Sequence, residues 1–552
     1  MQQPTATIGA ASRRTGHEPT TVVEAIAHEL RAAGVRRIYG MPGGGSNMAL
    51  VAAAATQGID FVLVHHEPAA MFMAAGEAEA TGRPGVCLAT LGPGVANSIN
   101  GLAHCSLDRV PLLLITDAPD DLSYSHQRID HRALVAAAVK RSISVDAGTV
   151  RATLREALAR AMDPPEGPVH LDLSPRTGAA ECASTEVAPA QPAVVPAPAP
   201  AELEKAGQLL ARASRPAVLV GLAARTSGCA EALRDFVETF GLPVLTTYKA
   251  KGTLPEDHPL ASGLVTNGQL EDRVLADADA IIGVGFDPVE LMQGPWRWSL
   301  PTVSLTRYPH DVGHVPSAVD VCGDLTQSLR ALSETLTAQG WAARWSDERL
   351  SAWADAEEFA AEQAARGVAP TDVVCSARRL SPPDTIATVD AGSHMFPASL
   401  FWRTARPRRF LISNGLSTMG YALPAAIGAS LASPEDPVVC FTGDGGLAMV
   451  VAELETAARL SARVIVVVFN DRTLNLIKIK QAKLGRETDA LDFGATDWAA
   501  VARGMGVEAY NVSDIDAFER AFASGLASHG PTLVDVDLDP STYPAMLAAV
   551  RG

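Results

Sequence analysis

The stretch Phe441-Thr442-Gly443-Asp444-Gly445-Gly446, with Asn470-Asp471 further along, decides the fold. A β-type run over 437–441 ends in this glycine turn, a helical pattern follows over 447–460, and an apolar strand over 464–469 leads to Asp471. In a parallel βαβ unit, both carboxylates would lie at the same carboxyl edge of the sheet, where ligands of open α/β sheets bind. Two carboxylates beside glycine amides suit a divalent cation that carries a diphosphate.

The composition is that of a soluble globular protein, with 47% hydrophobic and 19% charged residues. A length of 552 residues predicts about three domains. The formal net charge of −17 argues against nucleic acid or an anionic membrane as partner. No uninterrupted apolar run approaches the roughly 18 residues that a membrane span needs.

The chain start and the cysteines favour a cytoplasmic protein. Residues 1–18 are polar and lack an apolar core, so we interpret them as a flexible tail and not as a signal peptide. The seven cysteines are scattered and show no CxxC spacing. They are therefore interpreted as ordinary buried residues, not as a zinc site or a disulfide framework.

Strand-like and helical stretches alternate along the chain, which predicts mostly parallel sheets covered by helices on both faces. A Pro/Ala-rich linker at 185–201 separates a first domain, 19–184, from a central domain, 202–335. A linking helix is expected at 336–368, before a third domain at 369–552. The predicted fold is three doubly wound α/β domains. Strands are expected at 37–39, 61–64, 86–90, 112–116, 169–173, 218–220, 244–246, 281–284, 385–389, 410–413, 438–441, 464–469, 507–510 and 533–538.

Taken together, these features resemble the thiamine diphosphate (ThDP) enzymes, and within them the acetolactate-synthase-like 2-oxo acid decarboxylases and carboligases. The most specific element is Gly443-Asp444-Gly445, separated by 24 residues (446–469) from Asn470-Asp471. The resemblance implies three domains: a pyrimidine-binding domain, a central domain and a diphosphate-binding domain. It also implies an Mg²⁺ site formed by Asp444, the Asp471 side chain and the Thr473 carbonyl. The amides of Gly445 and Gly446 are expected to bind the diphosphate.

This chain departs from the family at the second metal residue. The family has two asparagines where the chain has Asn470-Asp471. An aspartate still offers a hard oxygen ligand and adds a negative charge. Binding of Mg²⁺ is therefore expected to be retained.

The stretch His65-His66-Glu67-Pro68 ends a predicted strand and opens a helix. It resembles the catalytic glutamate motif of the family, with Glu67 as the acid that shares a proton with N1′ of the aminopyrimidine. From the residues alone, Glu67 could equally be an acid favoured in the first turn by the helix dipole.

Further cofactor residues follow from the same resemblance. Asn97 closes the glycine-proline-glycine segment 90–97 and is assigned to the cofactor pocket. Ser393 and His394 follow a strand end and are expected to reach diphosphate oxygens, although His394 could instead be a satisfied surface histidine. In the segment 414–420, Met419 matches the apolar residue wedged between the two rings of ThDP. Ser417 stands where the family has a glycine, whose carbonyl contacts the 4′-amino group.

Four positions are candidates for substrate contact. Met41 replaces a tyrosine common in acetolactate synthases, and Gln127 aligns with a segment that faces their active site. Leu476 and Lys480 follow the metal ligands, and Lys480 takes the place of a tryptophan in the acceptor pocket. A lysine there would favour a substrate with an extra anionic group, unless it is simply solvated, like Lys478 on the same helix.

The central domain shows two departures from nucleotide-binding patterns. Gly283-Val284-Gly285 follows a strand but lacks the third glycine of a dinucleotide motif, which favours a plain tight turn. Phe286-Asp287-Pro288 and the strand end at 304–307 differ from the flavin-binding relatives. We therefore predict that the chain does not bind FAD.

The resulting hypothesis is ThDP- and Mg²⁺-dependent decarboxylation of a small 2-oxo acid with carboligation to a second carbonyl. Simple decarboxylation to an aldehyde is the first alternative. A catalytically silent binding or regulatory subunit with the ThDP fold is an alternative of another class. The resemblance also implies a homodimer or homotetramer, with each active centre formed by two chains.

Overall fold

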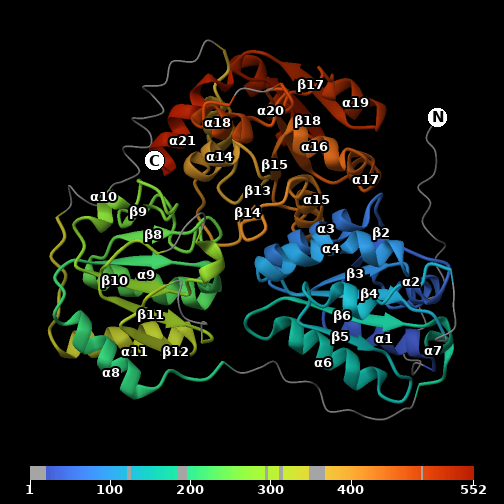
Figure 1. Cartoon of the computed structure of the whole chain (residues 1–552), viewed down its shortest axis with the longest axis horizontal. Helices are drawn as coiled ribbons and strands as arrows, with labels where there is room; N and C mark the ends of the chain where they lie inside the picture. Colours follow the sequence, from blue (N-terminus) through green and yellow to red (C-terminus); the bar gives the residue numbers. More distant parts are fainter. Residues whose placement is uncertain are drawn as a thin grey trace. The chain divides into compact units, whose positions relative to one another are not determined.

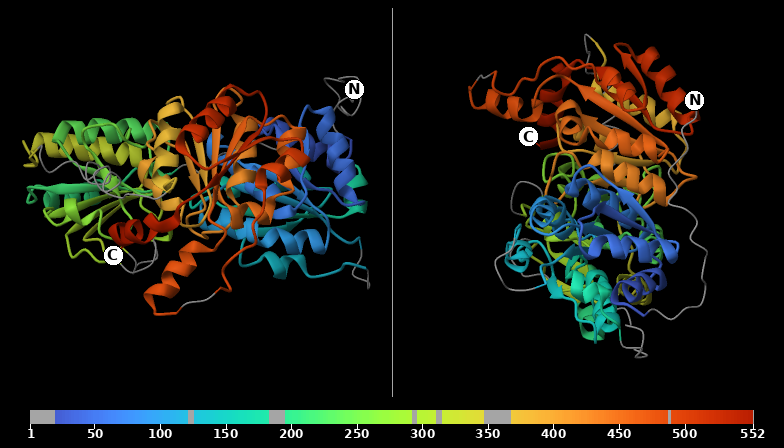
Figure 2. Two further views of the ribbon diagram at one scale, coloured as in Figure 1. Left: turned by 90° about the horizontal axis from the view of Figure 1, so that it is seen from above. Right: turned by 90° about the vertical axis from the view of Figure 1, so that its right-hand side faces the viewer.

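The computed structural model describes residues 20–120, 126–182, 195–291, 296–309, 315–346, 367–486 and 489–551 (Figure 1). The chain divides into two compact units, residues 1–78 with 82–193, and residues 79–81 with 194–552. Within the described residues there are three six-stranded sheets, and their paired strands are parallel throughout. Figure 2 shows the helices that cover these sheets. The predicted α/β class with three mostly parallel sheets is therefore confirmed.

The first sheet has the strand order β2-β1-β3-β4-β6-β5. Its core is formed on one face by Val86 and Leu88 with apolar residues of the first, second and sixth helices, while Cys87 points the other way and contacts the carbonyl of Ala70. The strands are β1 (Arg37–Met41), β2 (Asp60–Leu63), β3 (Gly85–Ala89), β4 (Leu112–Asp117), β5 (Arg141–Ser144) and β6 (Pro168–Leu173). The helices are α1 (Val22–Ala32), α2 (Ser46–Thr56), α3 (Glu67–Thr81), α4 (Pro93–Leu107), α5 (His131–Val135), α6 (Val150–Met162) and α7 (Pro175–Ala179).

The second sheet has the order β12-β11-β10-β7-β8-β9. Read from its far edge, this is the order 3-2-1-4-5-6 of dinucleotide-binding folds. The strands are β7 (Pro216–Val220), β8 (Val244–Thr246), β9 (Ala261–Leu264), β10 (Ala280–Val284), β11 (Thr302–Thr306) and β12 (Val319–Cys322). The helices are α8 (Pro200–Leu210), α9 (Ser227–Phe240), α10 (Asp272–Leu275) and α11 (Leu325–Ala338), with short 3₁₀ turns at Leu222–Ala224 and Pro288–Glu290.

The third sheet has the order β14-β13-β15-β16-β18-β17, which repeats the order of the first sheet. Its strands are β13 (Ile386–Val389), β14 (Phe410–Ile412), β15 (Val438–Gly443), β16 (Val464–Asn470), β17 (Glu508–Val512) and β18 (Thr532–Asp537). The helices are α13 (Pro370–Leu380), α14 (Met395–Phe401), α15 (Ala422–Ala432), α16 (Asp444–Val450), α17 (Glu453–Arg459), α18 (Asn475–Lys483), α19 (Trp498–Gly504), α20 (Ile515–Ala527) and α21 (Tyr543–Arg551). Residues of β15 and β16 are almost entirely buried, as expected for parallel strands covered on both faces.

The single helix predicted over 447–460 is wrong. The structure has two helices, α16 and α17, separated by a turn at 451–452. Glu453 begins the second helix, is buried, and accepts a hydrogen bond from Thr456 Oγ1 at 2.7 Å. A carboxylate is favoured at a helix N-terminus, so the break gives this buried acid a stabilising position.

Four strands were not predicted: β5, β9, β11 and β12. Strand β5 lies at a sheet edge and is only partly buried, so its Arg-Ser-Ile-Ser sequence lacks an apolar run. Strand β9 contains Gly263, and β11 and β12 alternate apolar with polar residues. These strands therefore lack the continuous apolar signal that marks the others.

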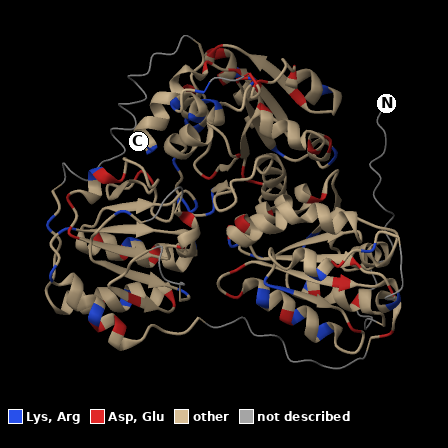
Figure 3. Cartoon of the chain, viewed as in Figure 1, with Lys and Arg blue, Asp and Glu red and all other residues tan. Residues whose placement is uncertain are grey.

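Some predictions lie outside the described residues. They are the tail at 1–18, most of the linker at 185–201 and most of the helix at 336–368, although α11 ends at Ala338. Among the described helices, none combines the length and the apolar character needed to cross a membrane. Figure 3 shows acidic and basic residues interspersed on helices around all three sheets.

Candidate active site

The structure brings Asp444 and Asp471 to one edge of the third sheet, as predicted. Strands β15 and β16 pair in parallel, with Gly443 opposite Phe469, and each is followed directly by one aspartate. Both aspartates line a cavity of about 260 Å³. Thr473 lines the same cavity, so the three predicted metal residues share one site.

The two aspartates raise each other's cost of ionisation, which a bound cation would lower. Burial and the charge of Asp471 raise the pKa of Asp444 to about 6. Burial also raises the pKa of Asp471, although its Oδ2 accepts a hydrogen bond from Asn475 at 2.9 Å. Two neighbouring buried carboxylates oppose each other's ionisation, and a divalent cation would remove that cost. The residues present therefore fit a bound Mg²⁺.

Gly445 and Gly446 line the cavity at the start of α16, with Met419 in the same wall. A Cβ on Gly446 would lie only 2.2 Å from Asp390 Oδ2, so a side chain there would displace this buried carboxylate. A Cβ on Gly445 would lie 3.3 Å from Met419 Cε and 3.1 Å from Phe493, which is a tight contact with the ends of side chains. Small residues at a helix start let backbone amides approach an anion such as a diphosphate.

Asp390 is a site residue that the sequence analysis missed. It is fully buried at the end of β13 and accepts three hydrogen bonds of 3.0 Å, from the Gly420 and Tyr421 amides and from Thr442 Oγ1. Burial raises its pKa to about 6. An acid at a strand end beside Gly392 was a usable signal, but its partners lie far away in sequence.

Ser393 and His394 are buried in the same cavity wall, so His394 is not a surface residue. Within the described part of the chain, Ser393 Oγ and His394 Nε2 have no hydrogen-bond partner. Burial lowers the pKa of His394 to about 3, and its ring stacks on Phe469 at 5.3 Å between centroids. Buried polar atoms without partners are costly, and a bound anion would satisfy them while favouring the protonated imidazole.

Ser417 lines the cavity in a left-handed backbone conformation, with φ of +52°. Its hydroxyl donates to the Asn414 carbonyl at 3.1 Å. Gln127 and Arg472 also have positive φ values, +63° and +60°. Residues other than glycine rarely adopt this conformation, and such strain is concentrated at functional sites.

The first sheet carries a separate group of predicted residues around Glu67. Glu67 is buried at the start of α3, directly after β2 and the two histidines. Asn97 Nδ2 donates to Glu67 Oε2 at 3.0 Å. A Cβ on Gly94 would lie 3.4 Å from Glu67 Oε1, so the turn before α4 lies close to the acid. Asn97 therefore contacts Glu67 itself.

Met41 and Gln127 lie near the same turn of the first sheet. Met41 ends β1 opposite Ala89, the last residue of β3. Gly92 has φ of +68°, and a Cβ there would lie 2.3 Å from the Gln127 carbonyl oxygen. Only glycine fits this close approach, which places Gln127 against the glycine turn.

Three domain models of one protein family together match most of the chain. Residues 20–134, 203–332 and 390–536 match, in that order, the N-terminal TPP binding, central and C-terminal TPP binding domains of thiamine pyrophosphate enzymes. A probable acetolactate synthase large subunit of Methanocaldococcus jannaschii is 30% identical over 94% of this chain and 92% of its own length. The chain belongs to the thiamine pyrophosphate enzyme family.

Other relatives of this ThDP-dependent enzyme carry similar names. Acetolactate synthase isozyme 3 large subunit of Escherichia coli is 30% identical over 94% of this chain and 95% of its own length. The acetolactate synthase large subunit of Parasynechococcus marenigrum is 31% identical over 93% of this chain and 86% of its own length. The similarity thus extends over all three sheets.

Lys478 and Lys480 of α18 differ in their surroundings in this enzyme. Leu476 and Lys480 line the cavity that contains Asp444. Lys478 instead forms an exposed ion pair with Asp492, at 2.6 Å from Nζ to Oδ1. Among the described residues, Lys480 has no recorded hydrogen bond or ion pair, whereas its neighbour is fully engaged.

The central sheet of the enzyme has its own carboxylate where dinucleotides bind in related folds. Glu290 follows β10, and its Oε2 accepts the amide of Leu222, which follows β7, at 2.9 Å. Its Oε1 accepts from Thr247 Oγ1 at 2.5 Å, and burial raises its pKa to about 7. The crevice between β7 and β10 is thus occupied by an acid of the chain itself.

Proposed function

We propose that this enzyme uses ThDP and Mg²⁺ to decarboxylate a small 2-oxo acid and to join the resulting fragment to a second carbonyl compound. The observation that carries the proposal is the neighbouring carboxylates of Asp444 and Asp471 in one cavity wall with Gly445 and Gly446. The acetolactate synthase names of the relatives support carboligation.

Each part of the cofactor has matching residues. When bound, ThDP supplies an electron sink for the loss of CO₂. Phosphate oxygens would accept hydrogen bonds from the start of α16 and from Ser393 and His394, while Met419 and Ser417 would contact the rings. The proposed Mg²⁺ ligands are Asp444, Asp471 and the Thr473 carbonyl.

Glu67 is proposed as the acid that exchanges a proton with N1′ of the aminopyrimidine. Because Asn97 donates to Oε2, the other oxygen, Oε1, is available for that proton. Gly94 lies beside Oε1, and a Cβ there would lie 3.4 Å from that oxygen.

The test is incubation of the Mg²⁺-loaded and ThDP-loaded enzyme with pyruvate, followed by product analysis. Carboligation predicts acetolactate, and simple decarboxylation predicts acetaldehyde. Acetaldehyde without acetolactate would replace the proposal by its first alternative for this substrate. Absence of ThDP binding by calorimetry would favour the silent subunit.

Lys480 is the proposed selector for substrates with a second anionic group. A screen of 2-oxo acids should show that Lys480→Ala raises KM for doubly anionic substrates by about 10- to 100-fold, because a charged hydrogen bond is lost. Lys478→Ala is the matched control, since Lys478 is paired with Asp492 outside the cavity. Equal effects of the two variants would contradict this role. Met41, Gln127 and Leu476 are proposed as further wall residues.

The proposal includes no flavin. Glu290 fills the crevice between β7 and β10 and takes up the Leu222 amide, so an anionic dinucleotide would meet a carboxylate there. The visible absorption spectrum of the purified enzyme tests this point, and a flavin band would overturn it. We also propose a cytoplasmic location, which the scattered cysteines without CxxC spacing favour.

Assembly is proposed as a homodimer or homotetramer, in which Glu67 of one chain and the metal residues of another form each active centre. The support is the family resemblance of both groups of residues. The oligomeric state can be measured by light scattering, and a mixing experiment described below tests the division of the centre.

A further inference from the structure

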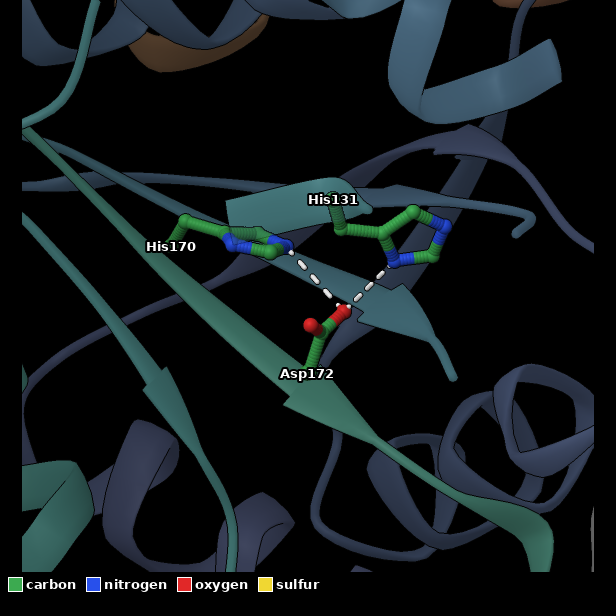
Figure 4. A group of neighbouring side chains, drawn as sticks. All are labelled: His131, His170 and Asp172. Atoms are coloured by element: carbon green, nitrogen blue, oxygen red, sulfur yellow. Dashed lines mark hydrogen bonds and ion pairs between the residues drawn. The ribbon is translucent and has the colours of Figure 1, made fainter. Parts of the chain in front are cut away.

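Two buried histidines and a partly buried aspartate of the first compact unit form a group: His131 at the start of α5, and His170 and Asp172 on β6 (Figure 4). His131 Nδ1 lies 2.8 Å from Asp172 Oδ1, and His170 Nε2 lies 3.4 Å from the same oxygen. Two histidines and a carboxylate this close suggest a metal site at first sight.

The hydrogen bonds at His131 fix its proton. The Gly92 amide donates to His131 Nε2 at 3.1 Å, so Nε2 must carry the lone pair. The proton therefore resides on Nδ1 and is donated to Asp172 Oδ1. A carboxylate that holds the tautomer of a histidine in this way orients the ring for its partner on the other side.

The same accounting covers His170. Thr116 Oγ1 donates its only proton to Asp172 Oδ1 at 2.7 Å, so it must accept from His170 Nε2 at 2.8 Å. His170 Nδ1 then accepts from Ser142 Oγ at 2.7 Å. Both nitrogens of both rings are thus in use, and a metal would have to break these bonds.

Asp172 remains charged in this network. Burial alone would raise its pKa, but hydrogen bonds from His131, His170 and Thr116 hold the pKa well below its ordinary value. The negative charge keeps the His131 proton on Nδ1. The network is therefore a directed chain of hydrogen bonds that ends at the amide of Gly92.

Gly92 connects this chain to Glu67. It immediately precedes α4, whose residues Gly94 and Asn97 are the ones that meet Glu67 Oε1 and Oε2. A shift of Gly92 would therefore shift both contacts of Glu67. We propose that His131, oriented by Asp172, is a positioning residue that sets the place of Glu67 through the start of α4. The catalytic part of this inference rests on the function proposed above.

A double-mutant cycle tests the connection. His131→Phe keeps the ring size but removes the acceptor, and should lower kcat by about 10- to 100-fold at saturating ThDP. In a Glu67→Gln background, the same change should lower the residual kcat less than twofold, because the effect passes through Glu67. Losses that multiply in the double variant would overturn the proposal.

Two further variants separate positioning from folding. His131→Gln retains an oxygen acceptor for the Gly92 amide and should recover most of kcat. His104→Phe is the matched control: His104 is also a buried histidine paired with an aspartate, Asp108, but at the far end of α4. A loss of kcat in His104→Phe equal to that in His131→Phe would contradict the role of His131.

A measurement without turnover keeps this inference distinct from the proposed function. Amide hydrogen exchange over residues 90–97 should be at least about tenfold faster in His131→Phe than in wild type, and unchanged in His104→Phe. Unchanged exchange in His131→Phe would overturn the anchoring itself. If no 2-oxo acid is turned over, the proposed function fails, while the exchange result still decides the anchor.

Discussion

The first and third sheets share one strand order but end their equivalent strands in different chemistry. The fourth strand of each is followed or closed by an aspartate, Asp117 in the first sheet and Asp471 in the third. Asp117 Oδ1 is used by Ser46 Oγ at 2.6 Å and the Asn47 amide at 3.0 Å. Asp471 instead lies beside a second carboxylate, Asp444.

This difference shows that sheet topology determines where the acids at the carboxyl edge lie, but not what they bind. In the first sheet the acid at the edge binds the protein's own helix start, and Glu67 is the acid proposed for proton exchange. In the third sheet two acids are proposed to hold a cation. The central sheet is a third case, since Glu290 closes its crevice from within.

The largest expected effect separates the two acids by role. Glu67→Gln should lower kcat by about 10²- to 10⁴-fold with little change in ThDP affinity, because only proton exchange is lost. Asp444→Asn should remove activity by weakening Mg²⁺ and ThDP binding. Calorimetry with Mg²⁺ and ThDP, alongside kcat, makes the distinction. Equal loss of ThDP binding in both variants would erase the proposed division between the sheets.

Mixing the Glu67→Gln and Asp444→Asn variants tests whether Glu67 and Asp444 of one active centre come from different chains. In a mixed dimer, one centre would combine intact Glu67 with intact Asp444, while the other would have both defects. Subunits exchanged after co-expression should therefore recover up to about a quarter of wild-type activity per total protein. If each chain formed its centre alone, no mixed dimer would be active.

A smaller effect concerns the acid that closes the central sheet. Since the folded pKa of Glu290 is about 7, above its ordinary value, the folded state holds the proton more tightly than the unfolded chain. The free energy of unfolding should therefore fall as pH rises from about 4.5 to 7, by on the order of 3 kcal/mol. Urea unfolding of wild type and Glu290→Gln at pH 5 and 7.5 checks this.

The expected outcome is a weaker pH dependence in Glu290→Gln. Glu334→Gln, on the exposed side of α11, is the matched control and should behave like wild type. The same slope in all three proteins would show that the folded state does not hold the Glu290 proton more tightly than the unfolded chain.

The smallest expected effect concerns Ser417, which follows β14. Strand β14 has the same place in the third sheet that β2, the strand before Glu67, has in the first sheet. Because Ser417 has φ of +52°, Ser417→Gly should stabilise the folded enzyme by about 1 kcal/mol, less the loss of its bond to Asn414. Thermal unfolding measures the change. A lower melting temperature would mean that the hydroxyl contact outweighs the backbone strain.

The sheets and the main acids were predictable because their signals are local. A buried strand, a glycine turn and an acid occur in succession at Asp444, and again, without the glycines, at Asp471. The strand end before Gly392 was a local signal for Asp390, but its role depends on Gly420 and Thr442, which lie on other segments.

Two other features depended on long-range contacts in the same way. Glu290 became interpretable only when β7 and β10 were seen to be neighbours. His131 was invisible because its partners, Gly92 and Asp172, flank it at distances of about 40 residues in sequence. Local sequence thus reveals which groups exist, and three-dimensional packing decides which of them are already satisfied.

Asp390 has a consequence for how the cofactor would be received. The Asp390 carboxylate, at the end of β13, accepts hydrogen bonds from the Gly420 and Tyr421 amides and from Thr442 Oγ1. These bonds connect three segments of the chain, so the segments are not expected to move independently. We therefore expect the proposed receptor for the diphosphate end to be largely preorganised before anything binds. ThDP would then lose its own freedom on binding, while the protein would lose little, and slow association followed by local ordering is not expected at this end.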